Sequence, residues 1–175
     1  MRADRRAFLT LLLALPALLT GCARNQATVA MAFPRASAAS PWVLDGQVWT
    51  GPFADAATAL GPEADQWRPL GPQRAWLAVY HHESEMQRKL TARAFSFETA
   101  AAARNAWEAM RPLRPRPFHA GDEGCWTEIG VMFVWGRLVF DIFGEQPSIQ
   151  SEVAAATLTG YIQHNLQPGL PEVPQ

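Results

Sequence analysis

Two adjacent histidines are the first residues in this chain whose types suggest metal chemistry. His81 and His82 are followed by Glu83, and Met86 lies three residues further on. Imidazole and thioether groups suit copper, and imidazole with carboxylate suits zinc. Adjacent strand residues point to opposite faces, so His81 and His82 would share an ion only if the chain turned there. We expect a polar strand end with no metal or other cofactor, and we keep both histidines as the candidate metal ligands.

Acidic residues form a second group, because paired carboxylates can act as acid and base when their surroundings separate their pKa values. Asp122 and Glu123 lie in a Gly-Asp-Glu-Gly sequence just after His119. That sequence is typical of a turn in which Asp122 accepts hydrogen bonds from local backbone amides. Both carboxylates are candidates for ligand binding.

Asp141 interrupts an apolar run, Leu138 to Phe143. On a strand, alternation places it on the same face as Val139 and Phe143. A carboxylate there faces solvent, pairs with an arginine or lines a cleft. We favour a structural role and keep Asp141 as a third candidate ligand-binding residue.

The chain contains seven tryptophans. Trp107 and Trp135 fall at predicted core positions, whereas Trp42 and Trp49 lie in less regular segments. Rings in such segments either cover the sheet or line a groove, so Trp42 and Trp49 are candidate ligand-binding residues. The arginine- and proline-rich segment 111–117 forms either a solvated loop or a patch for an anionic headgroup or cell-wall polymer.

The N-terminal segment has the pattern of an export signal. Arg5 and Arg6 precede an apolar run from Ala7 to Leu19, and two small residues then lead to Cys22. A run of 13 apolar residues is shorter than the roughly 20 that a transmembrane helix needs. We expect residues 1–21 to be a cleaved signal peptide.

The sequence Leu19-Thr20-Gly21-Cys22 resembles the lipobox of bacterial lipoproteins. The resemblance implies that Cys22 becomes the first residue and carries a diacylglycerol, which anchors the protein in a membrane. Ala23 follows the cysteine, and in a Gram-negative cell the sorting rule of those lipoproteins then favours the outer membrane, facing the periplasm. With Cys22 acylated, Cys125 is left without a disulfide partner, and we expect it to be a buried thiol.

The sequence Arg5-Arg6-Ala7-Phe8-Leu9 resembles a twin-arginine export signal. That resemblance implies export of an already folded domain, with an ordinary secretory signal as the alternative.

Composition bounds the mature protein. The chain is 49% hydrophobic and 18% charged, which is typical of a compact fold. A formal net charge of -1 gives no general attraction to nucleic acid, and we expect no nucleic-acid partner. The sequence also lacks a phosphate-binding glycine loop, a Gly-x-Ser-x-Gly elbow, a His-Glu-x-x-His motif and a Cys-x-x-Cys motif.

We expect residues 22–40 to be the acylated cysteine and a flexible tether, residues 41–166 one domain, and residues 167–175 a loose proline-rich tail. In that domain we predict strands over 41–49, 74–82, 88–95, 131–135 and 138–143 and helices over 52–60, 97–110 and 149–166. Ser96 and Ser148 are the predicted N-caps. The order predicts an α+β fold, with a mainly antiparallel sheet and its two principal helices packed on one face.

Residues 88–166 resemble small exported bacterial domains of unknown function. The matching segments are Phe95 to Met110, Gly121 to Gly124, Val131 to Phe143 and Ser148 to Leu166. The resemblance carries no catalytic assignment. We expect a membrane-anchored envelope lipoprotein that binds a ligand or an envelope protein partner without catalysis; the alternative is an enzyme or a metal or redox accessory protein exported folded.

Overall fold

The computed structural model describes residues 29–35 and 41–167. Arg5, Arg6, Leu19, Gly21 and Cys22, on which the export and lipidation predictions rest, lie outside the described residues. No helix within 29–35 and 41–167 is long and apolar enough to span a membrane.

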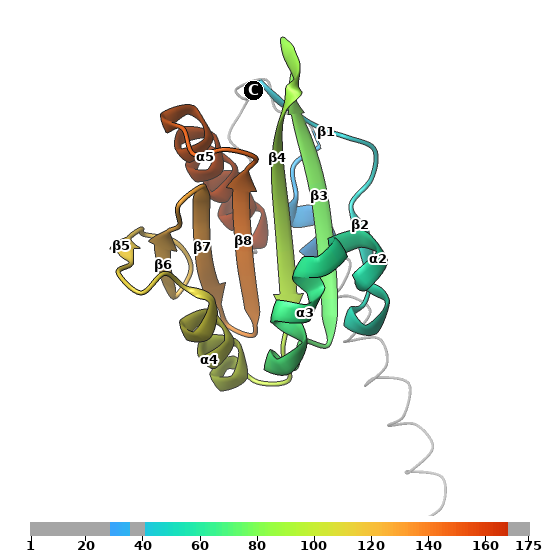
Figure 1. Ribbon diagram of the computed structural model, residues 1–175, viewed down its shortest axis with the longest axis vertical. Coiled ribbons are helices and arrows are strands. Elements are labelled where there is room, and N and C mark those ends of the chain that lie inside the picture. The colour runs from blue at the N-terminus through green and yellow to red at the C-terminus, as the bar shows by residue number, and fades with distance from the viewer. Residues whose placement is uncertain (1–28, 36–40, 168–175) are drawn as a thin grey trace, which may run out of the picture.

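One antiparallel sheet of eight strands forms the centre of the fold (Figure 1). Its order is β1-β3-β4-β8-β7-β6-β5, and β2 also pairs with β3. The strands are β1 (Trp42–Leu44), β2 (Trp49–Pro52), β3 (Arg74–His82), β4 (Glu85–Ser96), β5 (Arg116–Pro117), β6 (Glu123–Trp126), β7 (Gly130–Trp135) and β8 (Leu138–Gly144). The predicted α+β class and the mainly antiparallel sheet are confirmed.

Both predicted hairpins are present, and each joins strands that were visible as apolar patterns. β3 pairs with β4 along most of its length, and β7 pairs with β8 around Gly136 and Arg137. The predicted strand over 41–49 is instead divided into β1 and β2, because the chain turns at Gly46, whose φ is 77°.

Two long helices accompany the sheet, α4 (Ala100–Met110) and α5 (Ile149–Leu166). Ser148 caps α5 as predicted, with its hydroxyl accepting a hydrogen bond from the Ser151 amide. The predicted cap of α4 is wrong, because Ser96 is the last residue of β4 and Thr99 accepts the Ala102 amide. The shorter helices include α2 (Ala57–Leu60) and α3 (Ala64–Trp67), among the 3₁₀ turns Phe53–Asp55, Gly61–Glu63 and Arg68–Leu70, and residues 29–32 are also helical.

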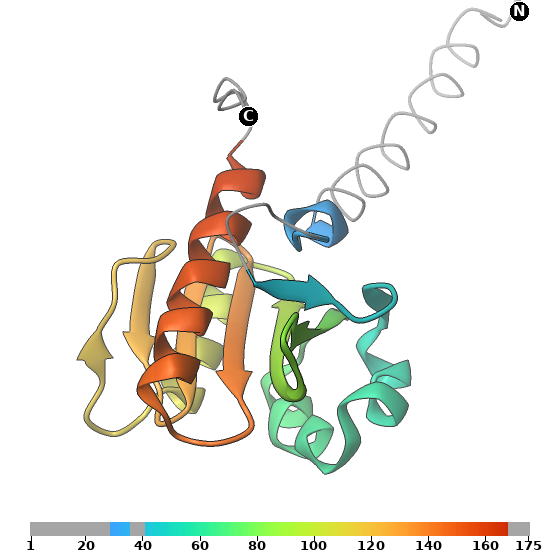
Figure 2. The same ribbon diagram turned by 90° about the horizontal axis from the view of Figure 1, so that it is seen from above.

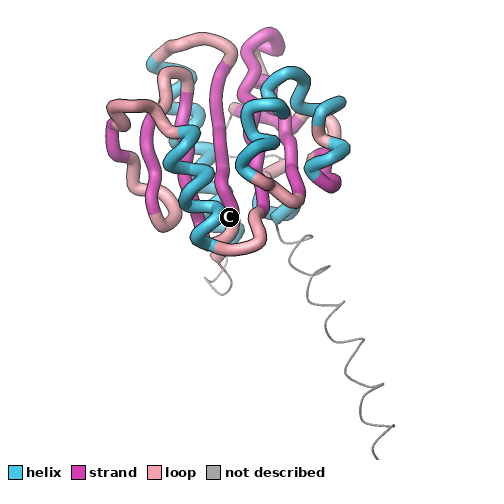
Figure 3. The backbone as a smooth tube through the Cα atoms, turned by 60° about the horizontal axis from the view of Figure 1, so that its bottom comes forward, coloured by secondary structure: helices cyan, strands magenta, loops and turns pink. Residues whose placement is uncertain are grey.

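The sheet has a buried core on each face, and α4 and α5 belong to different cores. α5 packs with Phe133, Phe140 and Ile142, whereas α4, α2 and α3 pack with Met132 and Val139. Neighbouring strand residues point to opposite faces, so the two helices lie on opposite faces of the β7–β8 pair (Figure 2). The prediction of both helices on one face is therefore wrong: β7 and β8 are apolar on both sides, and each side must be covered. Figure 3 shows the strands running side by side with helical segments over the sheet.

The segment 29–35 packs against the domain. Ala32 and Phe33 are buried, and the Phe33 ring lies 6.4 Å from that of Phe140. The Asn165 side-chain amide donates to the Ala32 carbonyl at 3.1 Å. The prediction that the tether extends to residue 40 is therefore wrong for these residues, whose apolar side chains complete the core beneath α5.

Candidate ligand-binding pocket

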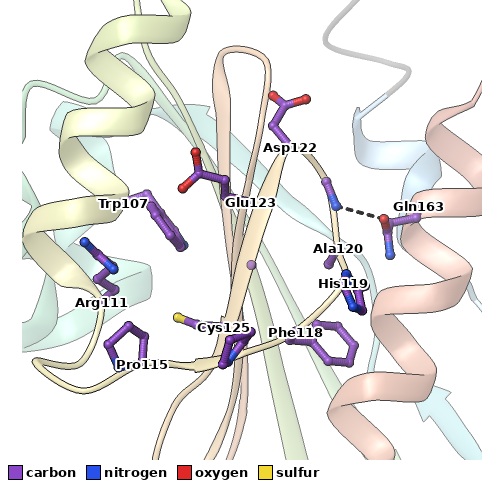
Figure 4. A pocket seen from close by; sticks show the side chains of 13 residues that line it. Trp107, Arg111, Pro115, Phe118, His119, Ala120, Asp122, Glu123, Cys125 and Gln163 are labelled. Carbon is purple, nitrogen blue, oxygen red and sulfur yellow. Dashed lines mark hydrogen bonds between the residues drawn. The ribbon is translucent and has the colours of Figure 1, made fainter.

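A pocket of about 490 Å³ lies at the edge of the sheet formed by β5 and β6 (Figure 4). Residues 117–125 provide most of its wall, together with Pro115. Trp107 and Arg111 line it from the C-terminal end of α4, and Gln163 lines it from α5. The pocket therefore brings together both principal helices and the loop that enters β6.

The loop from Phe118 to Gly124 is held by backbone interactions at its tip. Gly121 has φ +57°, and its amide donates to Gln163 Oε1 at 2.9 Å. The next amide, that of Asp122, donates to the Val134 carbonyl on β7 at 2.8 Å. A side chain on Gly124 would lie 2.8 Å from the Phe118 carbonyl, so the loop can fold back on itself only with glycine there. This wall of the pocket is a fixed part of the fold.

Trp107 contributes a buried hydrogen-bond donor without a partner. The residue is 4% exposed, and no described residue accepts a hydrogen bond from its indole Nε1. Figure 4 shows the nitrogen end of the ring directed toward the middle of the pocket. A buried donor left unpaired costs free energy, about 1 to 3 kcal/mol, so an acceptor that reached this group from the pocket would offset that cost.

Arg111 lies one helical turn after Trp107. Its guanidinium carbon is 5.1 Å from the centre of the Trp107 ring, a cation–π contact. Within 29–35 and 41–167, no carboxylate pairs with Arg111. The pocket therefore contains a cation whose charge is not neutralised by an ion pair.

The two carboxylates of the pocket are engaged elsewhere. Asp122 Oδ2 accepts a hydrogen bond from the Gly136 amide at 2.6 Å. The predicted partners were local backbone amides, whereas this partner lies in the β7–β8 turn. Glu123 forms an ion pair with Arg104 on α4. These bonds leave the carboxylates as fixed parts of the wall.

Cys125 is buried, as predicted, at 1% exposure on β6. Burial raises the pKa of its thiol, although the nearby Arg111 acts in the opposite direction. Its sulfur is therefore a neutral thiol at physiological pH.

Asp141 is separate from the pocket. It is 5% exposed, and its Oδ2 accepts hydrogen bonds from Arg93 Nε at 3.0 Å and Arg93 Nη2 at 2.7 Å. Glu63 pairs with the same guanidinium. Burial raises the pKa of the Asp141 carboxyl, and Arg93 opposes that rise. Of the three sequence-based alternatives, pairing with an arginine is the one that the structure contains.

The two candidate tryptophans also lie outside the pocket. Trp42 is buried in the core beneath α5, with its ring 5.3 Å from that of His82. Trp49 is half-buried against the opposite core. Of the two alternatives for these rings, covering the sheet agrees with their positions, and lining a groove does not.

The candidate metal ligands lie on β3 near its end. His82 Nδ1 is 3.1 Å from the Ser84 hydroxyl, and His81 is opposite Val43 in the register with β1. In the part of the chain that the structure describes, no three His, Cys, Asp or Glu side chains gather as a metal site.

The prediction of Trp107 as a core residue is confirmed, and Arg111 was predicted within a segment that forms either a solvated loop or a patch for an anionic group. Sequence reasoning did not bring the two together in one pocket. Their spacing of four residues on a helix was a usable signal, because such residues lie side by side. What the spacing does not contain is the return of residues 115–125 against them.

Comparisons with protein-family models, with curated proteins and with solved structures found no match to this chain.

Proposed function

We propose that this chain is an exported, lipid-anchored protein of the cell envelope whose α+β domain binds a small ligand in the pocket between α4 and β6. The observation that carries the binding function is the buried, unpartnered Nε1 of Trp107 in a pocket of about 490 Å³. Pockets of this size hold small organic molecules, and a few fixed polar groups orient them.

The lipid anchor is supported by the N-terminal sequence. Arg5 and Arg6, the apolar run that follows, and Leu19 to Cys22 have the order of a lipoprotein signal. A net charge of -1 offers little attraction to anionic lipid, so attachment would depend on acyl chains at Cys22, each contributing about 0.8 kcal/mol per buried CH₂. In a Gram-negative cell, the outer membrane, facing the periplasm, is the favoured destination.

Binding is better supported than catalysis. An acid–base pair needs carboxylates free to exchange protons with a substrate, whereas Asp122 is held by the Gly136 amide and Glu123 by Arg104. Asp141 pairs with Arg93 outside the pocket. The buried Cys125 has a raised pKa because of burial, which disfavours the thiolate that a nucleophilic mechanism requires.

The anchor is tested by replacing the acylated residue. Cys22→Ser should move the protein from the membrane fraction to the soluble fraction after export, while Cys125→Ser should leave it in the membrane. Retention of the Cys22→Ser protein in washed membranes would overturn the anchor.

The binding function is tested by native mass spectrometry of the full chain, gently extracted from its own membranes. We expect a mass greater than that of the acylated chain by one small molecule. Trp107→Phe should lower that occupancy, because it removes the Nε1 donor and keeps a ring. Trp76→Phe is the matched control, since Trp76 Nε1 is also buried and unpartnered but belongs to the core beneath α5. A bare acylated chain, or equal loss in both variants, would contradict a ligand in this pocket.

A further inference from the structure

The pocket between α4 and β6 presents hydrogen-bond donors that lack acceptors. Trp107 Nε1 has no acceptor among the residues described, and Arg111 has no carboxylate partner there. The guanidinium lies 5.1 Å from the indole ring centre, so the two donors are neighbours. Figure 4 shows both residues at the α4 side of the pocket, with Cys125 across from them on β6.

The other polar groups nearby do not compensate these donors. Asp122 and Glu123 accept from Gly136 and from Arg104, and both of those partners lie outside the pocket lining. The Cys125 thiol stays protonated because burial raises its pKa, so it adds no negative charge. The donors of Trp107 and Arg111 are therefore left for a ligand.

Apolar groups also line the pocket. The Trp107 ring, Pro115, Pro117 and Phe118 all line the same pocket. Contact with rings and proline carbons favours a ligand whose body is apolar, because such contact removes apolar surface from water.

We infer that the pocket binds a small organic carboxylate with an apolar body, whose two oxygens accept hydrogen bonds from Trp107 Nε1 and the Arg111 guanidinium. This inference rests on the proposed binding function of the same pocket. Arginine pairs with carboxylates through parallel hydrogen bonds, and charged acceptors form shorter, stronger bonds than neutral ones. A singly charged carboxylate also suits the site better than a phosphate dianion, because Asp122 and Glu123 line the same pocket.

The test uses the full chain in a non-ionic detergent, labelled with ¹⁵N and titrated with phenylacetate while its indole N–H signals are observed by NMR. The Trp107 signal is assigned as the one missing from the Trp107→Phe spectrum. We expect phenylacetate to move that signal downfield in a saturable manner, because the free N–H gains an acceptor. Phenylacetamide, with the same body and no charge, should bind at least about tenfold more weakly.

Variants distinguish the contribution of the Arg111 charge to binding from that of the rest of the pocket. Arg111→Gln should weaken phenylacetate binding by about tenfold or more and leave phenylacetamide binding nearly unchanged. Arg68→Gln is the control, because it removes an exposed arginine whose partner, Asp65, also lies outside the pocket lining. Trp76→Phe should leave both titrations unchanged.

Each contrary outcome points to a different failure. Equal binding of phenylacetate and phenylacetamide would overturn the carboxylate while leaving a ligand-binding pocket. Tighter binding of phenyl phosphate than of phenylacetate would assign the pocket to phosphates instead. No shift of the Trp107 signal with any of the three would overturn the inference, and an extra mass in the native spectrum of the same protein would then show that the proposed function survives with another ligand.

Discussion

Arg93 and Asp141 are directly opposite each other on β4 and β8, and their side chains form a buried ion pair of 2.7 Å between Nη2 and Oδ2. The guanidinium also pairs with Glu63, in the turn between α2 and α3, and lies 4.7 Å from the Phe143 ring centre. One arginine thus connects the centre of the sheet to the helical segment that covers this face. The pair is part of the framework that holds the domain together, apart from the pocket.

Removing one partner of this pair should be strongly destabilising. Asp141→Asn keeps the size of the side chain but leaves Arg93 with one carboxylate, Glu63, which is partly exposed to water. Because Glu63 still pairs with the guanidinium, the loss should be smaller than that of a fully unpaired buried charge, which is about 3 to 5 kcal/mol. We expect a loss of about 2 kcal/mol in the free energy of unfolding, measured by urea denaturation.

The exposed pair of Arg68 with Asp65 is the control for this prediction. Its side chains are 63% and 78% exposed, so Asp65→Asn should change the free energy of unfolding by less than about 0.5 kcal/mol. Replacing both buried partners, Arg93→Met with Asp141→Leu, should cost less than Asp141→Asn alone, because the one charge then left unpaired, Glu63, is partly exposed to water. Equal losses at the buried and exposed pairs would contradict a structural role for Arg93.

Local patterns in the sequence were sufficient for the elements whose neighbours in the chain are also their neighbours in space. The β3–β4 and β7–β8 hairpins and the Ser148 cap of α5 belong to this class, since each depends on a short segment. The sequence could not predict which face of the sheet α4 and α5 each cover. β7 is buried on both faces, so its side chains do not indicate which helix belongs to which side.

The candidate site shows the same division. Asp122 and Glu123 were identified because a Gly-Asp-Glu-Gly turn is a local pattern, and both do line the pocket. Their partners, Gly136 and Arg104, are 14 and 19 residues away, and only the folded chain brings them close. Trp107 was predicted as a core residue and Arg111 as part of a loop or an anion-binding patch, and their shared place in the pocket depends on the loop that returns against them.

Tyr80 should make the protein sensitive to alkaline pH. Its hydroxyl is buried, with no hydrogen-bond partner among the described residues, and burial raises its pKa above the ordinary value of 10.0. The folded protein therefore holds this proton more tightly than the unfolded chain. Below pH 10 the hydroxyl is protonated in both the folded and the unfolded chain, so its titration does not change the free energy of unfolding. Above pH 10 the unfolded chain releases the Tyr80 proton and the folded chain keeps it, so the free energy of unfolding falls as the pH rises.

Tyr80→Phe removes both the buried hydroxyl and its titration. At pH 7 we expect the free energy of unfolding to rise by about 1 kcal/mol, because an unpaired buried hydroxyl is removed. Between pH 9 and pH 11 the advantage of the variant over the parent protein should widen in urea denaturation. An advantage that stays constant over this range would show that the Tyr80 proton is not coupled to folding.

The loop that walls the pocket should depend on Gly121 more than on another glycine of nearly the same backbone conformation. Gly121 and Gly136 have φ of 57° and 56°, so an alanine at either position pays for a left-handed backbone, about 1 to 2 kcal/mol. A side chain on Gly136 meets nothing within 4 Å, whereas one on Gly121 would lie 2.2 Å from the Val134 carbonyl.

Gly121→Ala must therefore also displace backbone, with loss of the hydrogen bond from the Asp122 amide to the Val134 carbonyl. We expect a loss of at least about 3 kcal/mol in the free energy of unfolding, against about 1 kcal/mol for Gly136→Ala. Amide hydrogen exchange should increase at residues 118–124 in the first variant and only near the β7–β8 turn in the second. Equal losses of unfolding free energy in the two variants would mean that the loop moves to accommodate the alanine at no added cost. The pocket wall would then not be a fixed part of the fold.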